Sequence, residues 1–365
     1  PASGAGGRRF ESAHPDHLSH CTTASWPSRC NSLEGQFCIW GSGGQSHLQE
    51  GFVLVQLPLI VIAGPTGVGK TELSLRLAEH LGGQILSADS RQLYRRLDIG
   101  TAKPTTAQRE RVPHHLVDVL EPEQRYSAGT FSREARRIMG QIHQMGTPAL
   151  LVGGSGMYLD ATIDGLGASP PVDGELRRHL ASRWSQEGGA ALHHELVRQQ
   201  PATASRLDVN DRSRILRALE LLELTGDATL ATSSQTALRP RPLLITLTRP
   251  RQQLYARIGA RVEEMLAHGW REEVETLLAS GVPEDSAGME SLGYQQLVAH
   301  IRGHGSVDEA ISNICRRTRL YAKRQLTWLR RDRRYRWLDM SRLGQRGCMS
   351  RILDQWYAGG TPSAR

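Results

Sequence analysis

One stretch of the chain constrains its fold more than any other: an apolar run, a glycine-rich loop and a helix-forming segment follow one another directly. The run "LIVIAG" (59–64) carries no polar side chain, which is typical of a parallel strand buried on both faces. It leads into "GPTGVGKT" (64–71), where Gly-x4-Gly-Lys-Thr is the Walker A spacing. From Lys70 to Leu81 the pattern predicts a helix with Leu73 and Leu77 on its inner face. This order predicts an α/β protein that binds a phosphate.

The chemistry of the loop follows from its residue types. Its glycines allow backbone amides to face phosphate oxygens, and the helix N-terminus adds positive charge. We expect Lys70 to supply a further positive charge and the Thr71 hydroxyl to ligate Mg²⁺. The motif serves ATP, GTP and other diphosphates equally well, so the ligand stays open. The predicted phosphate-binding residues are Gly64, Pro65, Thr66, Gly67, Val68, Gly69, Lys70 and Thr71.

The rest of the chain predicts a parallel sheet flanked by helices. Strand patterns occur at "QILSAD", "ALLVGG" and "PLLITLTRP", and helical patterns lie between them, including one around 131–145. A polar, helical stretch at 173–211 contains no strand candidate and reads as an inserted helical domain. We therefore expect a core made of 58–172 and 212–343, with 344–365 as a C-terminal tail. The segment from about 252 to 337 is expected to be helical.

Asp89 is the acidic residue that ends a predicted strand, because "ALLVGG" is followed by serine and glycine instead. Three roles fit this position. Asp89 is a candidate Mg²⁺ ligand, a candidate general base, or a cap on the turn that follows, since Asp and Ser favour turns.

The charge of the chain indicates a polyanionic partner. The net charge is +8 with a pI near 9.6. Between Arg316 and Arg336, ten residues are Arg or Lys and one is acidic. Aromatic side chains are interleaved with them, and they serve either as stacking partners for bases or as inward-facing core. These aromatic residues are Tyr321, Trp328, Tyr335 and Trp337.

Composition also bears on location. No apolar run approaches the roughly 20 residues of a membrane-spanning helix. The five cysteines include no CxxC pair, and their odd number favours a reducing, cytoplasmic home. Residues 1–57 are rich in Ser and Gly without apolar periodicity, so we expect a disordered extension or a misplaced start. Their His and Cys residues fit no compact metal motif.

Ordered motifs from about 58 to 340 resemble the tRNA dimethylallyltransferase family, also called tRNA isopentenyltransferases, in its bacterial form. The motifs are "GPTGVGKT", "SADSRQLYRRLDIGTAKP", "PHHLVDV", "YSAGTF", "LVGGSGMYL", "DRSRILRALELLELTG", "LYARIGARVEEML" and "TRLYAKRQLTWLRRD". The resemblance implies a P-loop NTPase-like core with an inserted helical domain. It also implies transfer of a dimethylallyl group from dimethylallyl diphosphate to the 6-amino group of the adenine just 3′ of the tRNA anticodon.

The resemblance assigns roles to individual residues. Asp89 matches the family's proton acceptor, and Arg261 the arginine that reaches the diphosphate, beside Lys70 and Thr71 with Mg²⁺. The helical insertion matches a domain that grips the anticodon stem-loop, and nothing in the fold requires a dimer, so a monomer is expected. The implied tRNA contacts are Asp89, Ser90, Arg91, Gln92, Ser155, Ser213, Arg214, Arg217, Ser291, Gly293, Tyr294 and Gln295.

Two departures and three alternatives remain. Ser155 stands where the family usually has threonine, and Gln296 stands where an acid is common. The same scaffold serves adenylate isopentenyltransferases, which act on free AMP or ATP. A P-loop alone also fits a small-molecule kinase, or an RNA-binding protein with no activity. The role of Thr101, Ala102 and Lys103 is left open.

Overall fold

The computed structural model describes residues 59–166, 170, 173–228, 237–239 and 241–359. The predictions made for 1–57 lie outside the described residues. In the part of the chain that is described, no helix is both long and apolar enough to cross a membrane.

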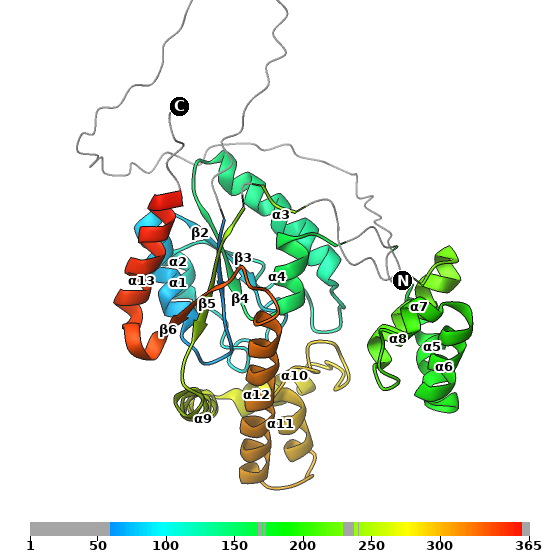
Figure 1. Cartoon of the computed structure of the whole chain (residues 1–365). Coiled ribbons are helices and arrows are strands. Elements are labelled where there is room, and N and C mark those ends of the chain that lie inside the picture. Colours follow the sequence, from blue (N-terminus) through cyan, green and yellow to red (C-terminus); the bar gives the residue numbers. More distant parts are fainter. Residues whose placement is uncertain (1–58, 167–169, 171–172, 229–236, 240, 360–365) are drawn as a thin grey trace, which may run out of the picture. The chain divides into compact units, whose positions relative to one another are not determined.

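The core is a six-stranded parallel sheet with the order β3-β2-β4-β1-β5-β6 (Figure 1). Because the strands are parallel, their carboxyl ends meet at one edge of the sheet, and the loops after β1, β2 and β4 converge there. The predicted parallel α/β fold is confirmed. The strands are β1 (Ile60–Ala63), β2 (Gln84–Ala88), β3 (His114–His115), β4 (Ala149–Gly153), β5 (Leu243–Thr248) and β6 (Arg336–Asp339).

Helices cover both faces of this sheet (Figure 1). Alternate residues of β1 enter different hydrophobic clusters, as the two-residue period of a strand requires. Val61 and Ala63 pack with Phe131, whereas Ile60 and Ile62 pack with Leu73. The core helices are α1 (Lys70–Leu81), α2 (Thr106–Arg111), α3 (Ala128–Gln144), α4 (Gly156–Ile163), α9 (Arg251–Ala267), α10 (Trp270–Ala279), α11 (Tyr294–Ile301), α12 (Val307–Leu329) and α13 (Met340–Gly359).

The C-terminal part differs from expectation in two ways. The segment expected to be helical up to 337 ends in β6, an edge strand whose four residues pair with β5. The described part of the expected tail forms most of α13, in which Cys348 and Ile352 are fully buried against the cluster around Leu73. Gly344, with φ of 64°, interrupts the helical backbone of α13. The boundary at 343 is therefore corrected.

A separate helical unit has its own hydrophobic cluster. It contains α5 (Gly174–Glu187), α6 (Gly189–Gln199), α7 (Pro201–Ala204) and α8 (Arg212–Thr225). Leu180 and Leu192 pack against Ile215 and Leu219 of α8. The expected boundary at 211 is corrected, because the apolar face of α8 is buried within this unit. The sequence of α8 shows that this helix is amphipathic, but it does not show which element its apolar face packs against.

Candidate functional site

The phosphate loop joins β1 to α1 at the carboxyl edge of the sheet. Gly67 and Gly69 have φ of 78° and 108°, a region that side chains with a Cβ rarely adopt. Two arginines brace the loop from outside. Arg257 Nε donates to the Gly67 carbonyl oxygen at 2.8 Å, and Arg249 Nε donates to the Val68 carbonyl oxygen at 3.0 Å. The loop is thus held in a shape that glycine permits and that side chains of later elements maintain.

Lys70 lies at the centre of a charged cluster. Its Nζ donates to the carbonyl oxygens of Gly64 and Pro65 at 2.9 and 3.0 Å. Burial lowers its pKa to about 8, while the Asp89 carboxylate opposes the decrease and the Arg261 guanidinium adds to it. Burial also lowers the pKa of Arg261, again opposed by Asp89. The structure therefore brings together the three charged residues predicted from separate motifs.

Thr71 is the first-turn hydroxyl of α1, and its residue is exposed. No group of three or more His, Cys, Asp or Glu side chains suited to a metal occurs among the described residues. Mg²⁺ commonly takes one or two protein ligands and completes its shell with substrate phosphates and water. An exposed Thr71 beside the phosphate loop fits that mode of binding, which does not need an all-protein cage.

Asp89 begins the turn after β2. Its Oδ1 accepts a hydrogen bond from the Arg91 backbone N–H at 2.9 Å, so it does cap the turn. The next amide, of Ser90, donates to Ser155 Oγ at 3.0 Å. The hydroxyl at position 155 therefore holds the turn that contains Asp89. Burial and, to a smaller extent, the Asp89 charge raise the pKa of Tyr321 to about 12. Capping uses one carboxylate oxygen and is compatible with a base role for the other.

The side chains of Arg91 and Gln92 are bound within the protein. Arg91 Nη1 donates to the Ala287 carbonyl oxygen at 3.0 Å. Gln92 Oε1 accepts from Ser87 Oγ at 2.9 Å, and Gln92 Nε2 donates to the Ala102 carbonyl oxygen at 3.1 Å. The predicted tRNA contact of Gln92 thus lies on a side chain that ties the turn after β2 to the loop near residue 102.

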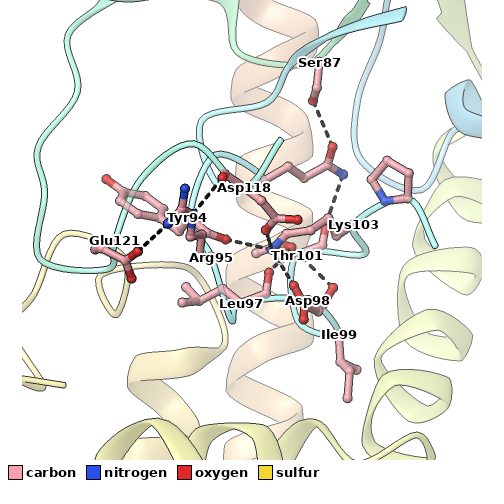
Figure 2. A network of polar contacts seen from close by, with 12 residues as sticks. Ser87, Tyr94, Arg95, Leu97, Asp98, Ile99, Thr101, Lys103, Asp118 and Glu121 are labelled. Carbon is pink, nitrogen blue, oxygen red and sulfur yellow. Dashed lines mark hydrogen bonds and ion pairs between the residues drawn. The ribbon is translucent and has the colours of Figure 1, made fainter. Parts of the chain in front are cut away.

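Lys103 has a structural role that the sequence left open. Figure 2 shows its side chain between Asp98 and Asp118. With a side chain only 1% exposed, Lys103 donates to both carboxylates, at 2.5 Å for Asp118, and to the Tyr94 carbonyl oxygen at 2.7 Å. Arg109 binds the second oxygen of Asp118 at 2.7 Å. A buried cation satisfied in this way holds the loop after Asp89 in place.

Glu273, on α10, has a structural role that its local sequence does not predict. Its carboxylate accepts from the backbone N–H groups of Asp98 and Ile99 at 2.8 and 2.7 Å, and from the Tyr294 hydroxyl at 2.6 Å. Helix α10 is far from this loop in sequence, and a glutamate on an amphipathic helix carries no local signal of such a role. Glu273 therefore anchors the same loop from a different element.

The predicted tRNA segment "SLGYQ" is largely buried. Ser291 is 2% exposed and Tyr294 is fully buried, so both side chains lie inside the protein. Among the implied contacts of this segment, Gln295 is the exposed side chain. Gly293 lies against Trp270, and a Cβ there would be 2.1 Å from the indole ring. Gln296 Oε1 accepts from the Gly293 N–H at 2.9 Å and so caps α11, a role that glutamine fills as well as glutamate.

The remaining implied tRNA residues lie on α8 of the helical unit. Ser213 and Arg214 are exposed, and Arg214 pairs with Asp211 at 3.2 Å. Arg217 is bound inside the unit, because it pairs with the fully buried Glu220 at 3.0 Å. Ser213 and Arg214 thus remain open to a ligand, whereas Arg217 supports the unit.

Of the aromatic residues of the basic segment, two face inward and one is partly exposed, and its stacking on a base stays a prediction. Trp328 Nε1 donates to Asp160 Oδ2 at 2.9 Å, and Tyr335 is buried, so both face inward. Trp337 is 37% exposed, and the Arg330 guanidinium lies 5.9 Å from its ring centre. Because Arg336 starts β6, the far end of the basic segment lies at the amino edge of the sheet, opposite the phosphate loop.

A phosphate loop at the carboxyl edge of a parallel sheet, with an aspartate and a half-buried arginine beside its lysine, defines a P-loop protein. Comparison with known proteins gives the family. The model described as "IPP transferase" matches residues 92–332, and the one described as "Isopentenyl transferase" matches residues 57–121. The chain belongs to the IPP transferase family.

Relatives cover most of the chain. It is 44% identical over 302 residues to a tRNA dimethylallyltransferase of Syntrophobacter fumaroxidans, covering 82% of this chain and 88% of that protein. A tRNA dimethylallyltransferase of Geobacter sulfurreducens is 43% identical, over 77% of this chain and 91% of the relative. The solved tRNA isopentenylpyrophosphate transferase of Bacillus halodurans superposes with a TM-score of 0.61 at 34% identity, covering 83% of this chain and 97% of that one.

Proposed function

We propose that this protein transfers a dimethylallyl group from dimethylallyl diphosphate to tRNA. The acceptor is the 6-amino group of the adenine immediately 3′ of the anticodon, and the product is isopentenyladenosine. The single observation that carries this proposal is the meeting of Lys70, Arg261 and Asp89 at the phosphate loop. Two cations suit a diphosphate leaving group, and a carboxylate beside them suits an amine that must lose a proton. The names of the similar proteins support the same reaction.

The leaving-group half of the reaction uses the loop. As the carbon–oxygen bond to the diphosphate breaks, negative charge grows on the departing oxygens. Loop amides, Lys70 and Arg261 stabilise that charge, since oriented donors act most strongly where charge develops. Thr71 and diphosphate oxygens would hold Mg²⁺, which neutralises further charge on the leaving group when bound.

The acceptor half uses the turn after β2. The adenine nitrogen forms the new bond to the allylic carbon, and its proton passes to the Asp89 carboxylate, which acts as general base. The Arg91 amide and the Ser155–Ser90 hydrogen bond orient that carboxylate. An adenine inside a stacked loop cannot reach this position, so the base is flipped out of the stack.

We further propose that the helical unit grips the anticodon stem-loop, with Ser213 and Arg214 on its exposed surface, and that the enzyme works as a cytoplasmic monomer. Ser90, Arg91 and Gln295 remain proposed tRNA contacts on the core. The positive net charge supports binding of a polyanion.

The decisive experiment follows radiolabelled dimethylallyl transfer with Mg²⁺, offering in parallel unmodified tRNA, free AMP, and ATP with no prenyl donor. Label on tRNA alone supports the proposal. Label on AMP alone would identify an adenylate prenyltransferase. ATP hydrolysis without prenyl transfer to either acceptor would contradict prenyl transfer altogether and favour a kinase.

A further inference from the structure

Gln325, on α12, bridges two loops that belong to different halves of the site. Its Oε1 accepts a hydrogen bond from the Thr66 backbone N–H at 2.9 Å, and its Nε2 donates to the Gly154 carbonyl oxygen at 2.9 Å. Gln325 is 7% exposed, so both bonds lie within the protein. A single buried amide thus joins the phosphate loop to the turn after β4.

The turn after β4 continues to the acceptor half. Ser155 follows Gly154 directly, and its hydroxyl holds the Ser90 amide next to Asp89. A continuous chain of contacts therefore runs from Thr66 through Gln325 and Gly154 to Ser155 and Ser90. It links the residues that face the diphosphate with those that face the adenine.

The neighbouring residues leave room for this bridge and for little else. A Cβ at Gly154 would lie 2.1 Å from Gln325 Nε2, and a Cβ at Gly156 would lie 2.3 Å from Trp328. Gln325 and Trp328 lie three residues apart, on the same face of α12. This helix face packs tightly enough on the turn to fix its distance from the phosphate loop.

We propose that Gln325 is a positioning residue that sets the phosphate loop at a fixed distance from the Asp89 turn, an inference that rests on the proposed prenyl transfer. The Thr66 amide is bound to Gln325, so it holds the loop in place, and the later amides of the loop serve the diphosphate. Correct spacing matters because the allylic carbon must lie in line between its leaving group and the adenine nitrogen, and a misplacement of about 1 Å can cost about 100-fold in rate.

The test replaces Gln325 with methionine, which has similar length and no amide. It separately replaces Gly154 with alanine, whose methyl would displace the same amide and also lie 3.1 Å from the Gly64 carbonyl oxygen. We expect each change to lower kcat for prenyl transfer by about 10- to 100-fold, with the KM for tRNA unchanged. The double variant should lose little more than either single variant, because both break one bridge. Thr327→Ala, on the exposed face of α12, is the matched control and should retain full activity.

Two results would overturn the inference: a kcat within twofold of wild type for Gln325→Met, or a KM for tRNA that rises as much as kcat falls. Thermal unfolding of each variant separates this loss from general destabilisation. A second readout, calorimetric binding of inorganic pyrophosphate with Mg²⁺, does not depend on prenyl transfer. If the wild-type protein transfers no label, the proposed function fails. In that case, pyrophosphate binding by Gln325→Met that is weaker than wild-type binding would by itself still support the bridge. Binding equal to that of the wild type would refute the bridge.

Discussion

At the scale of single residues, the charged groups of the site differ in how many hydrogen bonds they make within the protein. Asp89 accepts from one backbone amide through one oxygen, whereas Lys103 donates to three acceptors. Both are charged residues in one motif, and only their surroundings separate the proposed base, Asp89, from a structural cation, Lys103. A buried, fully satisfied cation has no remaining capacity for a substrate.

Replacing Asp89 with asparagine should isolate the base function. Asparagine keeps the oxygen that accepts from the Arg91 amide, so the turn persists, but it cannot take a proton. We expect kcat to fall by about 100-fold or more, with the affinity for tRNA within a few-fold of wild type. Steady-state transfer assays and filter binding measure the two quantities. An active Asp89→Asn variant would exclude Asp89 as the base.

The lowered pKa of Lys70 predicts a pH dependence of diphosphate binding. Lys70 is cationic below its pKa of about 8 in the free protein and neutral above it. A neutral amine attracts a diphosphate less, so affinity for inorganic pyrophosphate should fall above pH 8, by up to about tenfold per pH unit.

The control for this prediction is Lys70→Arg, whose guanidinium stays charged over the same range. Calorimetric titrations of both proteins between pH 7 and 9.5, at constant Mg²⁺, cancel the titration of pyrophosphate itself. Parallel pH profiles for the two proteins would show that Lys70 does not titrate in this range.

At the scale of elements, α10 and α11 hold the loop that follows the Asp89 turn. Trp270 starts α10 and is buried between two glycine positions, since a Cβ at Gly100 or Gly293 would lie 2.0 or 2.1 Å from its ring. Glu273, one turn later, accepts hydrogen bonds from the same loop. Residues distant in sequence thus determine the shape of a loop next to the site.

Replacing Gly293 with alanine should destabilise the protein through this packing. Gly293 has φ of 98°, and the added methyl would meet Trp270. Gly303 is the matched control, because its φ of 83° is similarly positive and nothing lies within 4 Å of its Cβ position. We expect Gly293→Ala to lower the free energy of unfolding by about 1–3 kcal/mol more than Gly303→Ala does. Urea unfolding followed by circular dichroism measures both, and equal losses would show that only backbone strain matters.

At the scale of the whole molecule, the described residues form separate hydrophobic clusters, each of which supports a different part of the fold. Two clusters cover the faces of the sheet, and a third lies inside the helical unit without sharing residues with them. Helix α13 completes one face of the sheet, although its sequence resembles a tail. Because the clusters share no residues, we expect the phosphate site to stay folded independently of the helical unit.

Deleting 173–228 tests this division. The deleted residues include the whole third cluster, so the sheet core should still fold. We expect the circular-dichroism signal of the remaining helices to persist and the pyrophosphate affinity to stay within a few-fold of wild type. Prenyl transfer to tRNA should fall below detection, since the proposed grip on the stem-loop is lost. Full transfer to tRNA by the deleted protein would refute the assigned role of the helical unit.

The sequence alone determined the parts of this protein that depend on neighbouring residues. The phosphate loop, α1 from Lys70 to Leu81 and the buried strands follow from glycine spacing and short-range periodicity, and ordered motifs identified the family. The roles of Gln325, Glu273 and Lys103, and the burial of Tyr294, were decided only by the tertiary structure. Each depends on a partner brought close by folding, and a local pattern records which face of an element is apolar but not what that face will meet.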